Sequence, residues 1–112
     1  MKPTLMRVTA MIGLVVALCA AAVVAAPSTP ATAEVSIDNF SFSPAELKVA
    51  VGTTVKWTNR DDIPHTVVST DTVFKSKVLD SEEKYSFTFT TAGSYAYFCS
   101  IHPKMTAKVI VQ

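Results

Sequence analysis

The sequence predicts an all-β fold, a Greek-key antiparallel β-sandwich, and three observations support this prediction. Beyond residue 33, apolar and polar residues alternate in short runs rich in valine, isoleucine and aromatic side chains, the pattern of strands with one buried face. Turn residues, among them Gly52 and Gly93, separate these runs. No run shows the period of about 3.6 residues that an amphipathic helix requires. About seven short strands with regular turns between them are typical of a sandwich.

The expected strands follow one another from residue 35 to the C-terminus. In the first, Val35 and Ile37 begin an alternation that Phe40 and Phe42 extend, and Trp57 alternates with polar neighbours in a later strand, which predicts a place in the core. The strands are expected around residues 35–42, 47–51, 55–57, 67–68, 85–89, 95–97 and 109–111. We therefore expect one domain over residues 34–112, small enough to benefit from a covalent or metal staple.

The first 33 residues differ in composition from the rest. Lys2 and Arg7 precede a nearly unbroken apolar stretch over residues 8–26, and a short linker rich in proline and alanine follows over residues 26–33. A positive start, an apolar run and small residues at a cleavage point define a secretory signal peptide. Cleavage fits after Ala26 and after Ala33. The alternative is an uncleaved membrane anchor, because the apolar run is just long enough to span a bilayer.

The charge of the domain excludes two classes of partner. The chain has ten Lys and Arg and nine Asp and Glu, and without Lys2 and Arg7 the domain has a net charge of about −1. There is no basic field for nucleic acid and no basic run for a membrane surface. Exported domains of this size often contain disulfides, yet Cys99 is the only cysteine after the leader. A metal ion is the other common staple.

The stretch YFCSIHPKM, residues 97–105, holds three candidate metal ligands spaced three residues apart: Cys99, His102 and Met105. A thiolate, an imidazole and a thioether together suit copper, and two histidines with one cysteine and a weak methionine form a blue-copper electron-transfer site. A second histidine is therefore required, and the only other histidine in the domain is His65. The sequence thus predicts one copper ion, cycling between Cu(I) and Cu(II), on His65, Cys99, His102 and Met105.

Each of these residues alone could be an ordinary packing or surface residue. Together, however, they are the only cysteine, the only methionine and both histidines of the domain. Zinc also binds two histidines and a cysteine, and the methionine favours copper. The acidic pairs at 61–62 and 82–83 are expected to be solvated turns, because adjacent side chains in an extended chain point apart. No histidine remains to activate a nucleophile or to build the second metal centre of an oxidase or nitrite reductase. We therefore expect a protein that is not an enzyme.

Three segments resemble the cupredoxins, and within that family the amicyanins most of all. The stretch YAYFCSIHPKM, residues 95–105, is similar to the short C-x-x-H-x-x-M ligand loop of that group. The stretch WTNRDDIPHTV, residues 57–67, is similar to the segment that leads to its first histidine, and residues 40–57 resemble its opening strands. The resemblance covers essentially the whole domain.

This resemblance implies a type 1 copper protein that carries single electrons in the periplasm, with His65, Cys99 and His102 as equatorial ligands and Met105 as the axial ligand. It also implies that redox proteins dock on an apolar patch around the loop histidine, whose matching residues here are Ile63, Pro64, Ile101 and Pro103. We expect a monomer with no membrane contact, unless the leader is retained as an anchor.

The chain departs from the family at three positions near the predicted site. Thr66 stands where the family usually has an asparagine that ties the two ligand loops together, which puts the reduction potential in doubt. Ile101 replaces a proline, and Lys104 replaces an aromatic residue on the docking rim. A cation there would change partner choice and salt dependence, so the amine dehydrogenase partner of the amicyanins does not carry over.

Two other functions compete with an electron carrier. A copper-binding or delivery protein would use the same four ligands, whereas a structural, immunoglobulin-like interaction domain would bind no metal. The coincidence of all four ligand residues argues against the structural domain. Delivery sites are often rich in methionine or histidine, and this domain has one methionine, which favours the carrier.

Overall fold

The structure, a computed structural model, describes residues 31–112. These residues form eight strands and no α-helix. The strands are β1 (Thr32–Asp38), β2 (Ser41–Ser43), β3 (Glu46–Val49), β4 (Thr54–Asn59), β5 (Val68–Ser69), β6 (Lys84–Thr88), β7 (Gly93–Phe98) and β8 (Thr106–Val111). Since no described segment is a long apolar helix, none can cross a membrane as one. The predicted leader lies outside the described residues.

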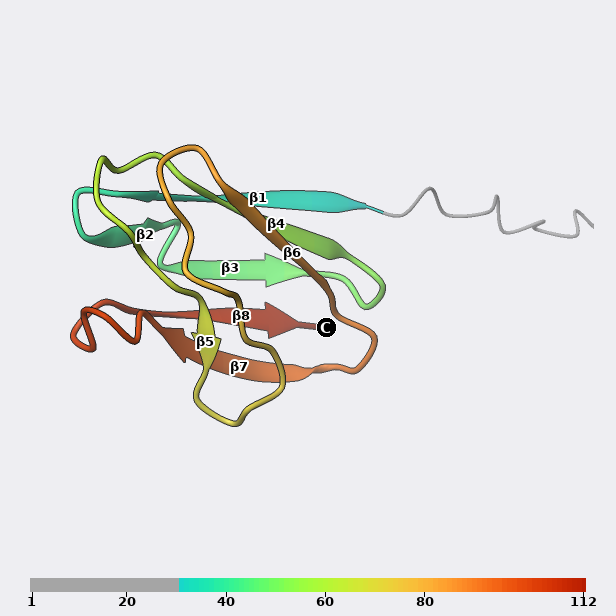
Figure 1. Ribbon diagram of the computed structural model, residues 1–112. Coiled ribbons are helices and arrows are strands. Elements are labelled where there is room, and N and C mark those ends of the chain that lie inside the picture. Colours follow the sequence, from blue (N-terminus) through green and yellow to red (C-terminus); the bar gives the residue numbers. More distant parts are fainter. Residues whose placement is uncertain (1–30) are drawn as a thin grey trace, which may run out of the picture.

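Two four-stranded sheets pack face to face, as Figure 1 shows. One sheet has the strand order β2-β1-β4-β6 and the other the order β3-β8-β7-β5. The chain passes repeatedly from one sheet to the other, because β3 lies between β2 and β4 in sequence but belongs to the opposite sheet. The predicted sandwich is therefore confirmed, and its inner faces form a single core.

The sheets are mixed, which the expected antiparallel arrangement did not include. β1 pairs with β4 in parallel, with Val35 opposite Trp57, and β3 pairs with β8 in parallel, with Leu47 opposite Val109. Parallel neighbours need a long crossover between them, and here β2 and β3 supply the crossover from β1 to β4. The β1–β4 register has a consequence for the site, because it brings the end of β1 beside the segment that follows Asn59.

Trp57 lies at the centre of the core and is fully buried. The rings of Phe74, Tyr85 and Tyr97 have their centroids 5.5 to 5.6 Å from its own. Its indole Nε1 and the Tyr97 hydroxyl are both buried, and burial raises the pKa of Tyr97 to about 12 against a smaller lowering by the Trp57 N–H. The predicted core role of Trp57 is therefore confirmed, and loss of a buried tryptophan side chain typically costs about 3–5 kcal/mol.

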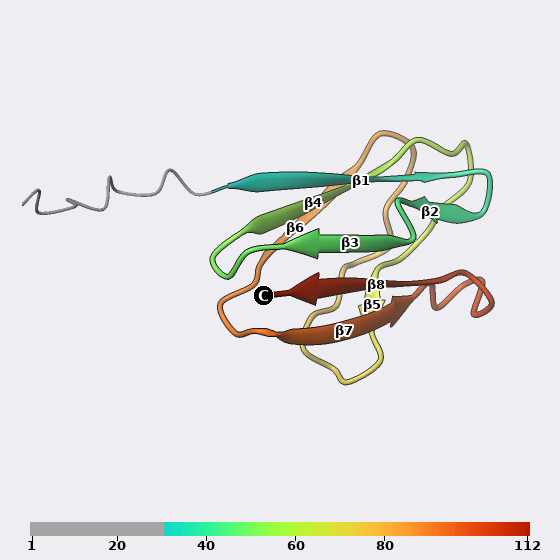
Figure 2. The same cartoon turned by 180° about the vertical axis from the view of Figure 1, so that it is seen from behind.

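The two ends of the sandwich differ, and the views of Figures 1 and 2 agree on what lies at each. At one end, the turn between β3 and β4 lies near the C-terminus, and Gly52 adopts a φ of 91° that favours glycine. At the other end, three connections come together: the β1–β2 turn, the segment from β4 to β5 and the β7–β8 loop. The last two carry His65, Cys99 and His102.

Two local expectations differ from the structure. β1 begins at Thr32, three residues before the first expected strand, because Thr32 and Ala33 pair with Thr54 and Val55. Phe40 is not an inward-facing strand residue: it lies between β1 and β2, adopts a positive φ and is 53% exposed. Its alternation with Phe42 in the sequence is broken by the turn.

Candidate metal centre

The loop that holds Cys99, His102 and Met105 consists of two consecutive turns. The N–H of His102 donates to the carbonyl of Cys99 at 3.2 Å, and the N–H of Met105 donates to the carbonyl of His102 at 2.8 Å. In each turn the hydrogen bond joins residues three apart, as in a β-turn. Because the three candidate ligands are also three residues apart, they lie at the ends of the two turns. Pro103 follows the first residue of the second turn, where its fixed φ is favoured. The N–H of Cys99 then donates to the carbonyl of Met105 at 3.0 Å and closes the loop.

The segment that delivers His65 is organised by Asn59, a fully buried residue at the end of β4. The Asn59 amide donates to the carbonyls of Ile63 and Leu79, both at 2.9 Å, and its Oδ1 accepts the N–H of Asp61 at 3.0 Å. His65 itself exchanges two backbone hydrogen bonds with Leu79, at 3.1 and 2.8 Å. One buried side chain and one backbone bridge therefore fix the path of the chain into the site.

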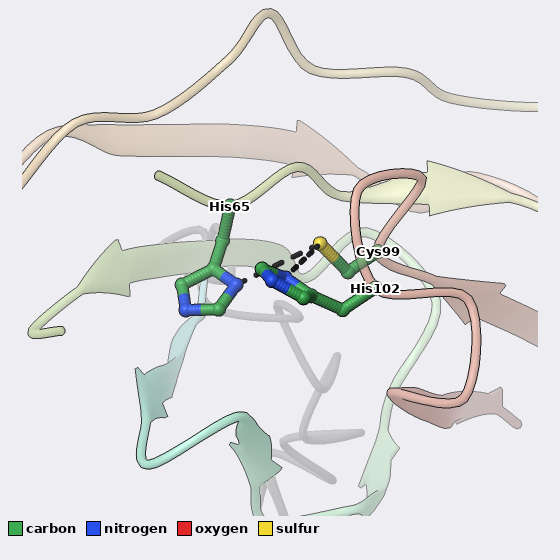
Figure 3. Close-up of side chains that lie close together, drawn as sticks. All are labelled: His65, Cys99 and His102. Atoms are coloured by element: carbon green, nitrogen blue, oxygen red, sulfur yellow. Dashed lines mark hydrogen bonds between the residues drawn. The ribbon is translucent and has the colours of Figure 1, made fainter. Parts of the chain in front are cut away.

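Three of the predicted ligand residues converge, as Figure 3 shows. The Cys99 Sγ lies 3.7 Å from Nδ1 of His65 and 3.8 Å from Nδ1 of His102. The ligand atoms of the three residues all lie within 4.8 Å of one another. A metal bound to sulfur at about 2.3 Å and to nitrogen at about 2.0 Å needs these atoms about 3.5 Å apart at a tetrahedral angle and about 3.7 Å apart at 120°. The observed separations of 3.7 and 3.8 Å fit an ion between the sulfur and each nitrogen.

Asp61 fixes which nitrogen of His65 can bind a metal. Its Oδ2 lies 2.9 Å from Nε2 of His65, and its side chain is only 12% exposed. The His65 ring N–H beside it, with the N–H of Phe40, holds the pKa of the Asp61 carboxyl below its usual range. Because an ionised carboxylate only accepts hydrogen bonds, Nε2 carries the ring proton and Nδ1 presents its lone pair toward Cys99. A carboxylate in this position orients a metal-binding histidine and raises its basicity.

The surroundings of Cys99 favour its thiolate. Burial raises the pKa of the thiol, but the hydrogen bond from the N–H of Thr66, with further contacts to His102, outweighs it and lowers this pKa to about 6. The Thr66 N–H lies 3.4 Å from Sγ. The thiolate is the form of cysteine that binds metals, so the fold prepares this side chain for a metal.

Thr66 joins the two ligand-bearing segments, the role that the family gives to an asparagine. Its Oγ1 accepts the N–H of Ser100 at 2.7 Å and lies 2.7 Å from the Ser100 hydroxyl. The same Oγ1 lies 3.8 Å from Sγ of Cys99. The threonine thus links the residue after His65 to the residue after Cys99.

His102 and Met105 lie at the border between the site and the surface. Met105 is buried, whereas His102 is half-buried. Both line a cavity of about 500 Å³, open to the surface, together with Phe40, Ile101, Pro103 and Lys104. The wall of this cavity is mainly apolar, and Ile101 is 46% exposed. The site is therefore closed on the His65 side and reaches the surface on the His102 side.

Comparison with known proteins agrees with this geometry. The Cupredoxin-like domain family matches residues 9–111 of the chain, and those residues contain all four predicted ligands. The protein belongs to the cupredoxin family.

Amicyanins are among the relatives of this cupredoxin. It is 41% identical to the amicyanin of Paracoccus denitrificans over 83 residues, which cover 70% of this chain but only 63% of that protein. It is 34% identical to amicyanin-alpha of Methylorubrum extorquens over 102 residues, which cover 86% of each chain. A chloroplastic plastocyanin of Tetradesmus obliquus is 36% identical over 84 residues, 63% of this chain and 58% of that protein.

Solved structures of cupredoxins superpose on this one. The purple cupredoxin from Nitrosopumilus maritimus matches with a TM-score of 0.70 and 34% identity over 71% of this chain and 99% of that chain. A variant amicyanin in its Cu(I) form matches with a TM-score of 0.69 and 37% identity over 72% of this chain and 82% of that chain. Both confirm the β-sandwich predicted from the sequence.

Two residues of the centre were missed by sequence reasoning. Asp61 was expected to be a solvated turn residue, yet it bonds the ring of His65; its position four residues before the histidine was the only available signal. Phe40 was expected in the first strand, yet it lies in the turn after β1, and its ring lies 5.1 Å from the ring of His102. Asp62, the neighbour of Asp61, is exposed as expected.

Proposed function

We propose that this protein is a type 1 copper protein that carries single electrons between redox partners and is not an enzyme. The observation that carries the proposal is the convergence of Cys99 Sγ with Nδ1 of His65 and of His102 at 3.7 and 3.8 Å. Two imidazoles and a thiolate with a methionine nearby are the donor set of a blue-copper site. His65, Cys99, His102 and Met105 would hold the copper ion.

When bound, copper supplies the one-electron change between Cu(II) and Cu(I). The chain contributes a set of donors whose positions are fixed before the metal binds. Asp61 holds the tautomer of His65, the environment of Cys99 favours the thiolate, and Thr66 ties the two ligand segments. Donors that are fixed in this way change little between oxidation states, and small rearrangement favours fast electron transfer.

We propose that partners dock on the apolar surface around His102. The cavity beside this histidine supports the proposal, since Ile101 and Pro103 line it together with Phe40. Pro64 is exposed and Ile63 half-buried on the neighbouring segment. Lys104 lies on the rim, where a charge steers the encounter of partners more than it adds affinity. An electron would enter and leave through the half-buried His102, and the protein would act as a monomer.

We also propose that the domain is exported to the periplasm and that the leader is cleaved after Ala26. Cleavage after Ala33 would remove Thr32 and Ala33 of β1, which pair with Thr54 and Val55 of β4. It would also remove the carbonyl of Ala31, which accepts the N–H of Thr54 at 2.9 Å. The pairing of β1 thus favours the earlier of the two cleavage points. The intact mass of the protein purified from a periplasmic extract tests this: a chain starting at Pro27 is expected, and one starting at Glu34 or at Met1 would contradict it.

The experiment that separates a carrier from a delivery protein compares two rates on the copper-loaded protein. Electron self-exchange is measured from NMR line broadening in mixtures of oxidised and reduced protein, and copper loss is measured by transfer to a colorimetric Cu(I) chelator. A carrier exchanges electrons much faster than it loses copper. Copper transfer that outpaces electron self-exchange would contradict the carrier and support delivery.

A further inference from the structure

Phe40 is an exposed apolar residue with an unusual backbone conformation. It lies between β1 and β2 and is 53% exposed, although it is a large apolar residue. It adopts a φ of 55°, and Asn39 before it adopts a φ of 49°. Asparagine tolerates this left-handed region, but a bulky residue rarely occupies it. Strained backbone of this kind persists where the surrounding structure enforces it, and it is concentrated at functional sites.

The turn that holds Phe40 is tied directly to the metal centre. The Phe40 N–H donates to Oδ2 of Asp61 at 3.3 Å, and the same oxygen lies 2.9 Å from Nε2 of His65. Within the turn, Oδ1 of Asp38 accepts the N–H of Asn39 at 2.9 Å. The parallel register of β1 and β4 makes this connection possible, because the N–H of Arg60 donates to the carbonyl of Ile37 at 2.7 Å and places Asp61 beside the turn.

The ring of Phe40 contacts both histidines edge to face. Its centroid lies 5.1 Å from that of His102 and 5.9 Å from that of His65, and both interplanar angles are 88°. These distances and angles are those of favourable aromatic pairs. His65 already has a carboxylate on its Nε2, whereas the described hydrogen bonds of the His102 ring comprise only its contact with Sγ of Cys99 at 3.8 Å. The rings of His65 and Phe40 both have centroids 5.1 Å from that of His102, and Phe40 is the one of the two that lines the open cavity with His102.

We propose that Phe40 is a positioning residue of the metal centre, which holds the His102 imidazole in the orientation that turns Nδ1 toward Cys99. This inference rests on the proposed copper function, because a restrained His102 matters only if it binds a metal. The strained turn fixes the position of the Phe40 ring, and Asp61 links this turn to His65 because its Oδ2 contacts both the Phe40 N–H and Nε2 of His65. An aromatic pair of this kind shifts an equilibrium by about two- to tenfold, and that is the effect expected on the retention of His102.

The test compares Phe40→Asn, Phe40→Leu and Val51→Ala in the full chain. Asparagine keeps a positive φ and removes the ring, whereas leucine keeps an apolar side chain without an aromatic face. Val51 is an exposed apolar residue in the turn at the opposite end of the sandwich, so its truncation is the matched control. Two quantities are measured: hydrogen exchange of the His102 amide in the metal-free protein, and the rate of copper loss from the reduced protein to a Cu(I) chelator.

Both quantities are expected to rise about two- to tenfold in Phe40→Asn, by less in Phe40→Leu, and not at all in Val51→Ala. The proposal is overturned if both Phe40 variants match the parent protein, or if copper loss rises while His102 exchange does not. If Phe40→Asn fails to fold, Phe40→Leu decides by the same criteria. A parent protein that binds no copper would overturn the proposed function, and the metal-free measurement would still show whether Phe40 restrains His102.

Discussion

The two histidines of the centre are held in opposite ways. His65 is fully buried, and its backbone exchanges two hydrogen bonds with Leu79. Its ring Nε2 forms a hydrogen bond with the Asp61 carboxylate. His102 is half-buried in a short loop, where its backbone bonds only to residues of the same loop and its ring packs against Phe40. One histidine is thus anchored to the sandwich, and the other is anchored to the loop that carries it.

This difference separates two requirements of an electron carrier. The donors must keep their positions when the charge of the metal changes, and one donor must come close to a partner. The His65 segment meets the first requirement through buried side-chain hydrogen bonds, which are costly to break. The loop meets the second by exposing part of His102 beside an apolar cavity. Changes to the His65 segment should therefore mainly affect stability and metal affinity. Changes at the rim of the cavity beside His102 should mainly affect the rate at which partners associate.

The largest effect on stability is expected from Asn59→Ala. This change leaves the carbonyl of Ile63 and the N–H of Asp61 without their partner, and the carbonyl of Leu79 keeps only its bond from the N–H of His65. Since each unsatisfied buried group costs about 1–3 kcal/mol, we expect the free energy of unfolding of the metal-free protein to fall by about 3 kcal/mol. Urea denaturation measures it. Asp62→Ala, at an exposed position nearby, is the control, and an equal loss in both variants would contradict the anchoring role of Asn59.

Asp61→Ala should break the tautomer control of His65. Loss of a carboxylate behind a metal-binding histidine typically lowers metal affinity about 10- to 100-fold, and a competition assay with a copper chelator measures it. Asp61→Asn should have a smaller effect, because the amide oxygen still accepts the Nε2 proton but carries no charge. Unchanged copper affinity in Asp61→Ala would show that His65 is oriented by its backbone alone.

A smaller effect is expected from Thr66→Val, which keeps the shape of the side chain and removes the hydroxyl between the two ligand segments. The N–H of Ser100 loses its acceptor, so we expect a loss of about 1–2 kcal/mol in the free energy of unfolding and a changed reduction potential. Ser100→Ala leaves that N–H bonded to Thr66 and should cost less. Equal losses in the two variants would mean that the hydroxyl pair, rather than the N–H bond, ties the segments.

The smallest effect is expected from Lys104→Gln, on the rim of the cavity. The free energy of unfolding should change by less than about 0.5 kcal/mol, and the absorption of the copper site should not change. Electron transfer to a small anionic oxidant such as hexacyanoferrate should slow by about two- to threefold at low ionic strength and recover at high salt. If the electron-transfer rate of the parent protein did not depend on salt, Lys104 would not be part of the docking surface.

Sequence reasoning succeeded where the information was local. The alternation of Val35, Ile37 and Trp57 with polar residues predicted buried strand faces, and all three are buried. The three-residue spacing of Cys99, His102 and Met105 matches the two consecutive turns on which the structure places them. The sandwich was also predicted correctly.

The features that were missed depend on the path of the chain in space. Asp61 reaches His65 only because Asn59 bends the segment between them. Phe40 was expected to continue the first strand because it alternates with Phe42, and the one local sign of a left-handed turn is Asn39 before it. The parallel pairs arise from crossovers between the sheets, which local patterns do not specify.

The measurement that tests the central claim most directly is the absorption and EPR spectrum of the purified protein after addition of Cu(II), beside that of Cys99→Ser. A thiolate bound to copper in this site should give an intense visible charge-transfer band and a narrow copper hyperfine splitting, and both should be lost in Cys99→Ser. Weak d–d absorption alone, identical in the two proteins, would contradict the account, because His65, Cys99, His102 and Met105 would then not bind copper together.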